Sequence, residues 1–273
     1  MYKLISLILC LFFLGCATGR GINEGQLNMY SYDQEKAIGE QFAQMVGGQF
    51  EPLYDPQISA YVDKIGQKIV NVATDPLFDY QFRVLKHDMV NAFTVGAGYV
   101  FVTVGLMNAA PHEAGFASVV GHEIGHVLSR HVAERLTQAN LLGLAASIAG
   151  GGAGQVIDLF GNVGLLQFGK ANELEADRLG LQLIYRSRYN LDGAIDMFKV
   201  LKKLADDKGT SSLLGDLLAT HPNTQLRIDK LKELIPQYKA KEKTTLNTES
   251  FKTIHNKVGQ YLKEIQAKQK KTS

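Results

Sequence analysis

The segment 118–135 constrains the fold most, because it places two histidines and a glutamate on one predicted helix. His122, Glu123 and His126 form the pattern His-Glu-x-x-His inside a stretch whose apolar residues have helical spacing. Residues four apart lie on one helix face, so His122 and His126 can direct their imidazoles to one point. This geometry predicts a catalytic zinc site, with Glu123 as its general base.

The same pattern has an alternative interpretation, a core helix in which the string is fortuitous. That alternative predicts no bound metal and a melting temperature that chelators leave unchanged. Gly125 lies between the two histidines, where glycine costs about 1 kcal/mol of helix propensity relative to alanine. Its presence indicates that another backbone approaches the helix closely at this point.

A second predicted helix, at 170–185, carries two acidic residues at helical spacing. Glu173 and Asp177 are four residues apart and share one face. Glu173 is the expected third zinc ligand, which would complete a His2Glu site for one Zn2+ per chain. Asp177 is expected to accept the remaining ring N–H of a zinc histidine and so fix its tautomer. Glu175 faces another side of the helix and is expected to be solvated.

The first fifteen residues have the features of a secretory signal. A short basic start is followed by an apolar run that is too short to span a bilayer. The sequence Leu14-Gly15-Cys16 resembles a bacterial lipobox, although Phe13 stands where leucine is usual. We therefore expect a signal peptide at 1–15, lipidation at Cys16 and a tether at 16–30. An ordinary cleaved signal or an uncleaved anchor is the alternative. Ala17 after the cysteine favours the outer membrane by the same resemblance.

The rest of the chain predicts an α+β fold that is mostly helical, with a small sheet beside the active-site helix. The composition, 45% hydrophobic and 21% charged over 273 residues, is ample for one core, and the net charge of +2 does not indicate nucleic-acid binding. An exposed strand edge could bind substrate as an added strand; alternatively, all strands are simply core. The expected elements are helices at 32–46, 56–73, 192–206, 211–219 and 224–234, and strands at 80–85, 90–95 and 99–104.

Residues 136–157 form an uncharged segment with a late glycine cluster. Its length nearly matches a bilayer span, but glycines and amides interrupt it. We expect a flap or helical hairpin near the active-site cleft, with a membrane-surface contact as the second interpretation. The lysine-rich tail, 239–273, has apolar residues at helical spacing and is expected to pack as a helix on the domain at 31–238.

Taken together, these motifs resemble the zinc metallopeptidases that include the CAAX prenyl proteases and the bacterial heat-shock membrane protease. The resemblance covers about residues 30–235. Within the family, the chain is similar in particular to the periplasmic lipoproteins that act in outer-membrane protein quality control. It implies a gluzincin-type fold in which the ligands and base are those given above. No helical-repeat domain is recognisable after the catalytic part. The motifs that carry the resemblance are His122–His126, Asn172–Arg178, Asn91–Phe93, Val102–Leu106, and His221-Pro222 with Arg227.

His221 and Arg227 receive their candidate roles from this resemblance. His221 would visit the open zinc position or contact substrate; alternatively, it only buttresses the following helix. Arg227 would stabilise the developing oxyanion; a structural salt bridge is the alternative. If His221 occupied the fourth zinc position, the resting enzyme would be latent. The other histidines, which lack partners at ligand spacing, are expected to be ordinary: His87, His112, His131 and His255.

The sequence therefore predicts a zinc metalloendopeptidase that cleaves extended or misfolded outer-membrane proteins. It would be lipid-anchored at the periplasmic face of the outer membrane of a Gram-negative bacterium. Glu123 would take a proton from water and pass it to the leaving amine. The rival from another class is a zinc-stabilised chaperone or binding lipoprotein with little or no turnover.

Overall fold

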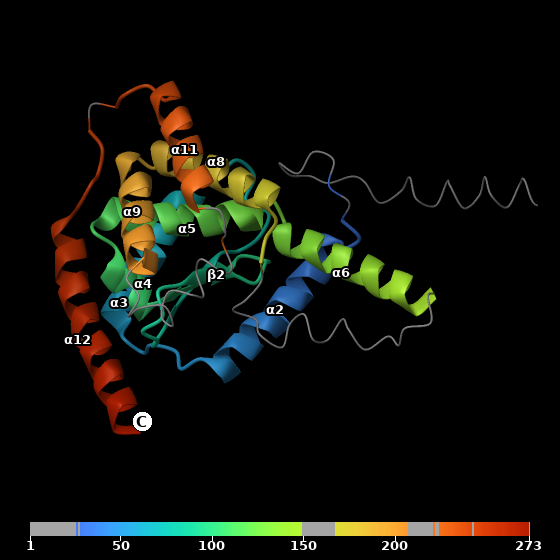
Figure 1. Ribbon diagram of the computed structural model, residues 1–273, viewed down its shortest axis with the longest axis horizontal. Coiled ribbons are helices and arrows are strands. Elements are labelled where there is room, and N and C mark those ends of the chain that lie inside the picture. Colours follow the sequence, from blue (N-terminus) through green and yellow to red (C-terminus); the bar gives the residue numbers. More distant parts are fainter. Residues whose placement is uncertain are drawn as a thin grey trace, which may run out of the picture.

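The described part of the chain is a set of helices packed around a small sheet and one central helix, α5 (Figure 1). This computed structural model describes residues 26, 28–148, 167–206, 221, 224–241 and 243–272. The predicted class, α+β and mostly helical with a small sheet, is confirmed. The elements are α2 (Tyr32–Gln49), α3 (Pro56–Val70), β1 (Gln81–Leu85), β2 (Ala92–Thr94), β3 (Tyr99–Thr103), α4 (Val104–Ala109), α5 (Glu113–Leu128), α6 (His131–Ile148), α8 (Lys170–Arg186), α9 (Asp192–Asp206), α11 (Thr224–Leu234), η3 (Ile235–Gln237) and α12 (Glu249–Thr272).

Helix α2 begins with a capping box and is longer than predicted. The Ser31 side chain accepts a hydrogen bond from the Gln34 amide, and the Gln34 side chain accepts one from the Ser31 amide. The helix was predicted over 32–46, ending before Gly47 and Gly48, and that end is wrong. Neither glycine adopts a positive φ, and the Phe50 amide still bonds to a carbonyl of the last turn. Because the two glycines do not adopt the left-handed conformation that ends many helices, they continue the helical hydrogen-bonding pattern.

Helix α3 starts at the predicted residue because Asp55 caps it and Pro56 occupies its first turn. The Asp55 side chain accepts hydrogen bonds from the amides of Gln57 and Ile58. The same carboxylate also binds α12, through Lys257 Nζ at 2.7 Å and the Tyr261 hydroxyl at 2.9 Å. One aspartate thus stabilises a local helix start and the docking of the C-terminal helix.

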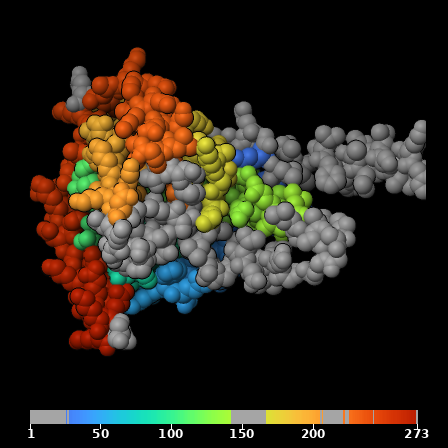
Figure 2. Space-filling view, viewed as in Figure 1, coloured from blue at the N-terminus to red at the C-terminus, as the bar shows by residue number. Residues whose placement is uncertain are grey.

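Helix α12 lies along one side of the molecule, at the opposite side from α6 (Figures 1 and 2). The predicted apolar stripe is confirmed, since Phe251, Ile254, Val258 and Ile265 are buried against the domain. The polar residues of α12, including most of its lysines, are exposed or only half-buried. This helix therefore completes the core from outside and does not enter the region of α5 and α8 described below.

The sheet has the order β1-β3-β2, with β3 parallel to β1 and antiparallel to β2. Gly96 and Gly98 adopt positive φ values of 85° and 86° and form the turn between β2 and β3. Phe93 and Phe101 lie opposite each other, with ring centroids 5.2 Å apart. Strand β2 contacts α5, and among the described residues it pairs on one side only. Strand β2 is thus an edge strand next to the central helix, and all three of its residues are buried.

Helices α5 and α8 approach each other at the backbone. A Cβ atom added to Gly125 would lie 2.8 Å from the carbonyl oxygen of Ala176. A Cβ atom on Gly180 would lie 2.9 Å from the amide nitrogen of His122. Both distances are too short for a side chain without movement of a backbone. The expectation that another backbone approaches Gly125 is confirmed, and it fixes how the two motif-bearing helices face each other.

Several predicted segments lie outside the described residues. These are the signal at 1–15, Cys16, most of the tether, the helix at 211–219 and the second half of the uncharged segment 136–157. The first half of that segment belongs to α6, which ends at Ile148. In the portion of the chain that can be described, no helix is long and apolar enough to cross a membrane.

Candidate metal centre

Helix α5 places three predicted site residues in the interior of the protein. His112 caps the helix, and its ring Nδ1 accepts a hydrogen bond from the Gly115 amide at 3.0 Å. About three turns further along the helix, the Nε2 atoms of His122 and His126 lie 3.0 Å apart. Glu123 is fully buried beside them. The helix therefore directs both imidazoles to one point, as the spacing of the pattern predicts.

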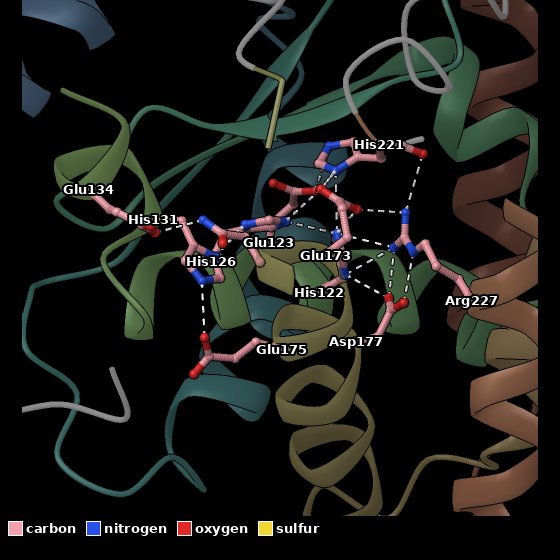
Figure 3. Close-up of polar contacts among 11 residues, drawn as sticks. His122, Glu123, His126, His131, Glu134, Glu173, Glu175, Asp177, His221 and Arg227 are labelled. Carbon is pink, nitrogen blue, oxygen red and sulfur yellow. Dashed lines mark hydrogen bonds and ion pairs between the residues drawn. The ribbon is translucent and has the colours of Figure 1, made fainter. Parts of the chain in front are cut away.

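Helix α8 supplies the carboxylate that faces these imidazoles. Glu173 Oε2 lies 3.5 Å from His122 Nε2, and Glu173 Oε1 lies 3.4 Å from His126 Nε2. Glu173 is only 1% exposed. The backbone contact between α5 and α8 brings this carboxylate to the histidines. The structure thus brings together the three residues predicted as ligands, as Figure 3 shows.

His221 lies in the same cluster, although it is far from the other residues in sequence. Its Nδ1 lies 3.0 Å from Glu173 Oε1 and 3.4 Å from His122 Nε2. Its Nε2 lies 3.5 Å from Glu123 Oε1. One ligand atom from each of His122, His126, Glu173 and His221 lies within 4.8 Å of the others. His221 therefore occupies a position from which it can ligate a metal or contact the base.

The chemistry and spacing of this cluster fit zinc. Three imidazoles and one carboxylate are ligands that zinc prefers, and all four side chains are buried. Tetrahedral ligands at zinc-bond length stand about 3.3 Å apart, close to the 3.0–3.5 Å separations measured here. Both carboxylate oxygens of Glu123 are buried without a hydrogen-bond partner among the described residues. A water or substrate group beside a bound metal would satisfy them.

The two carboxylates of the centre have pKa values displaced in opposite directions. Burial raises the pKa of Glu123, although the neighbouring His221 and His122 act against it. Burial also acts to raise the pKa of Glu173, but His221, His122 and His126 outweigh it and hold that pKa well below its usual range. Glu173 is therefore suited to remain an anionic ligand, whereas Glu123 is suited to accept a proton.

Asp177 and Arg227 form a buried group on one side of the cluster (Figure 3). Asp177 Oδ1 lies 2.9 Å from His122 Nδ1, which is the contact predicted from its spacing. Arg227 binds Asp177 through two nitrogens and reaches Glu173 Oε2 with Nη1 at 2.7 Å. For Arg227 the sequence left open an oxyanion role or a salt bridge. The geometry favours the salt bridge, because its guanidinium already contacts two carboxylates.

The other side of the cluster contains residues that the sequence reasoning missed (Figure 3). His131, expected to be ordinary, is fully buried, and its Nδ1 lies 2.8 Å from His126 Nδ1. Its Nε2 lies 3.3 Å from Glu175 Oε2. The expectation that Glu175 is simply solvated is wrong, because its side chain is only 20% exposed and contacts this ring. No sequence signal indicated this contact, because a spacing of five residues does not place two side chains on one helix face.

An apolar pocket opens beside Glu123 and His221. The structure forms it between α5, α8, α9 and α11, so it is continuous with the metal cluster. Its floor and walls are mostly aliphatic or aromatic, which suits an apolar side chain better than a charged one. The lining residues that carry this argument are Val119, Leu181, Ile184, Met197, Phe198 and Leu201.

Comparison with known proteins matches the chain to one peptidase family and to relatives named as proteases. Residues 56–235 match peptidase family M48. The chain is 31% identical over 223 residues to the beta-barrel assembly-enhancing protease of Yersinia pestis. The aligned region covers 77% of this chain and 45% of that relative. It is 31% identical over 212 residues to the protein of the same name from Escherichia coli, and this region covers 72% of this chain and 43% of the relative. It is 27% identical over 248 residues to the mitochondrial metalloendopeptidase OMA1 of Schizosaccharomyces pombe, and this region covers 85% of this chain and 72% of the relative.

The chain spans less than half the length of the two bacterial relatives. The region matched by the family nevertheless contains all of α5 and α8 and the whole buried cluster. The resemblance inferred from the sequence motifs is therefore confirmed, and so are the enzyme class and the metal. This chain belongs to peptidase family M48 and is a zinc metalloprotease.

Proposed function

We propose that this protein is an endopeptidase that cleaves extended or misfolded outer-membrane proteins from the periplasmic face of the outer membrane. The observation that carries the catalytic part is Glu123, a fully buried carboxylate without a hydrogen-bond partner among the described residues, next to four potential metal ligands. His122, His126 and Glu173 are the proposed ligands. His221, with Arg227 behind it, completes the proposed site.

Glu123 performs the proton transfers in this proposal. Zinc, when bound, supplies Lewis acidity that lowers the pKa of water and polarises a carbonyl. One Glu123 oxygen accepts a proton from the attacking water as the water oxygen bonds to the scissile carbonyl carbon. The same carboxyl then gives that proton to the departing amide nitrogen as the C–N bond breaks. The raised pKa of Glu123 favours this temporary protonation.

Strand β2 and the apolar pocket are the proposed substrate-binding features. An extended peptide that reached the edge of β2 would add to it through main-chain hydrogen bonds, which select a backbone conformation more than a sequence. The pocket lined by Val119 and Met197 would receive an apolar side chain of that peptide. Both features favour unfolded segments, because folded proteins hide their apolar side chains and pair their strands.

The proposed location rests on the sequence and on the names of the relatives. The lipobox-like Leu14-Gly15-Cys16 supports a lipid anchor at Cys16, and Ala17 supports the outer membrane. Two relatives carry the name beta-barrel assembly-enhancing protease, which supports a role near outer-membrane proteins. Partners bound by the remaining half of those longer relatives are not carried over to this chain.

A latent resting state is a second element of the proposal. The His221 ring has Nδ1 among the ligand atoms of the cluster, so it can occupy the position that a substrate needs. The rival function, a zinc-stabilised chaperone with little turnover, uses the same cluster without catalysis. The two differ in whether the carboxylate of Glu123 is required for activity.

The experiment that tests the proposal measures zinc content and casein cleavage on the purified full chain. Wild type is compared with Glu123→Gln and with the matched control Glu40→Gln, whose residue is exposed on α2. We expect one zinc in all three proteins. Cleavage should fall by about 100-fold or more in Glu123→Gln alone. Equal cleavage by wild type and Glu123→Gln would overturn the mechanism, and the absence of zinc from all three would overturn the site.

A further inference from the structure

The two histidines of α5 are held by different kinds of partner. His122 Nδ1 contacts a carboxylate, Asp177 Oδ1, which is the common way in which proteins orient a metal-binding imidazole. The equivalent nitrogen of His126 faces another imidazole instead, because His126 Nδ1 lies 2.8 Å from His131 Nδ1. Both His126 and His131 are fully buried. Solvent therefore does not replace this contact, and His131 is the group that meets the far nitrogen of His126.

His131 has a second nitrogen, and that nitrogen is also engaged. His131 Nε2 lies 3.3 Å from Glu175 Oε2. Glu175 stands on α8, two residues after Glu173, so both helices of the centre contribute to the arrangement. The contacts form a continuous series from His126 through His131 to Glu175, which Figure 3 shows opposite Asp177 and Arg227.

The direction of these hydrogen bonds follows from the proposed metal site. If His126 gives its Nε2 lone pair to a metal, its ring proton must sit on Nδ1. His131 Nδ1 must then accept that hydrogen bond, and the proton of neutral His131 must sit on Nε2. From there it is donated to the Glu175 carboxylate. With His131 Nδ1 protonated instead, His126 would carry its proton on Nε2 and could not bind a metal.

The local structure holds both rings in this relation. The turn between α5 and α6 contains Arg130 in the left-handed region, with φ of 52°. Arg130 Nε binds Glu35 Oε2 at 2.7 Å, which fixes the turn from the side of α2. Phe168 stacks on His126 with ring centroids 4.1 Å apart and an interplanar angle of 24°. The imidazole is therefore restrained at its face by Phe168 and at its edge by His131.

We propose that His131 is a positioning residue that, with Glu175, holds His126 in the tautomer that presents Nε2 to zinc. The inference rests on the proposed zinc ligands and goes beyond them, because it assigns function to two residues outside the ligand set. His131 is not one of the proposed ligands and acts through its contact with His126. Its contribution is to metal affinity, by favouring one of the two neutral forms of His126.

The test compares three substitutions on the full chain. His131→Leu removes the acceptor with an apolar side chain of similar size. His131→Asn keeps an acceptor, since the amide oxygen of asparagine can take the place of Nδ1. His255→Leu is the matched control, because His255 is half-buried and bonds the Asn108 carbonyl on α4. Zinc dissociation constants are measured by chelator competition, and thermal unfolding is measured on the metal-free proteins.

We expect His131→Leu to weaken zinc binding by about 10-fold to 100-fold. His131→Asn should recover most of that loss, and His255→Leu should bind zinc as wild type does. Equal zinc affinities in wild type and His131→Leu would overturn the proposal. So would an asparagine variant as weak as the leucine variant, since shape alone would then explain the loss. Thermal unfolding of the metal-free proteins separates loss of affinity from loss of folding.

A spectroscopic readout completes the design. In zinc-loaded wild type, nitrogen-15 NMR of the histidine rings should show a protonated Nδ1 on His126, protected from exchange. The opposite tautomer would overturn the proposal even if the affinity changed. A wild type that binds no zinc would overturn the ligand assignment as well. Zinc binding without any effect of His131 would overturn the positioning role and leave the proposed function standing.

Discussion

Arg227 meets Asp177 with two of its nitrogens: Nε lies 2.7 Å from Oδ2, and Nη2 lies 2.7 Å from Oδ1. Both side chains are buried, at 4% and 6% exposure. The paired geometry is the one in which arginine binds a carboxylate most specifically. Because Asp177 in turn contacts His122, this ion pair determines the orientation of a predicted zinc ligand from behind.

Substituting Arg227 should therefore destabilise the protein strongly. Arg227→Met leaves Asp177 buried without its ion-pair partner, which costs about 3–5 kcal/mol in free energy of unfolding. Urea unfolding of the metal-free protein measures this. The control is Arg186→Met, an exposed residue on the same α8 helix as Asp177, which should change stability by less than about 0.5 kcal/mol. If the two variants unfold alike, the ion pair does not stabilise the fold.

Removing the His221 ring should raise cleavage. His221→Ala removes one of the four potential ligands but leaves His122, His126 and Glu173, so zinc should be retained. If His221 holds the substrate position in about nine of ten molecules, cleavage of casein should rise about tenfold. His255→Ala serves as the control. A loss of cleavage in His221→Ala, with zinc still bound, would instead assign His221 to substrate binding.

Two glycine substitutions should have opposite effects on stability. Gly125→Ala puts a methyl group 2.8 Å from the backbone oxygen of Ala176, and separating the helices should cost about 1–3 kcal/mol. Gly47→Ala is a matched change, because that glycine is also helical and has nothing within 4 Å of its added Cβ. It should stabilise the protein by about 0.5–1 kcal/mol. Thermal unfolding distinguishes them, and the same sign for both would contradict the close approach of α5 and α8.

The docking of α12 should depend on pH through Asp55. Burial acts to raise the pKa of Asp55, but hydrogen bonds from Lys257, the Ile58 amide and Tyr261 leave it below its ordinary value. A carboxyl with a lowered folded-state pKa contributes stability above its unfolded pKa of about 3.9 and loses it as the pH falls through the folded value. The stability advantage of wild type over Asp55→Asn should therefore be constant near neutral pH and shrink below about pH 4. An advantage independent of pH would refute the charge-based docking.

Local patterns in the sequence were sufficient to place the candidate ligands on helices, although the single helix predicted over 118–135 is wrong, because α5 ends at Leu128 and α6 begins at His131. The His122 and Glu173 helices carry their motif residues at helical spacing, and Asp55 with Pro56 marks a helix start by residue type alone. Gly125 could be interpreted in advance because glycine weakens a helix, so its place between two ligands indicated a close backbone contact. These predictions depend on contacts within a few residues, which sequence spacing describes well.

The contacts that were missed depend on the path of the chain between elements. His131 lies near His126 because Arg130 takes a left-handed conformation, and no side-chain pattern required that of an arginine. Glu175 faces the cluster because α8 packs closely against α5 at Gly180. The role of Arg227 stayed open for the same reason, since its partner is 50 residues away. The end of α2 was predicted too early because glycine permits a helix end without requiring one, and the helix continues through Gly47 and Gly48.

The backbone contact between α5 and α8 has a consequence for the choice of metal. His122, His126 and Glu173 come from two helices that pack in direct backbone contact at Gly125 and Gly180, so widening the site would break that packing. The cavity they define is therefore nearly fixed in diameter, and its size is set by main-chain atoms rather than by flexible side chains. Ions that need longer bonds or about six to eight oxygen ligands, such as calcium, should be rejected by size as well as by ligand type.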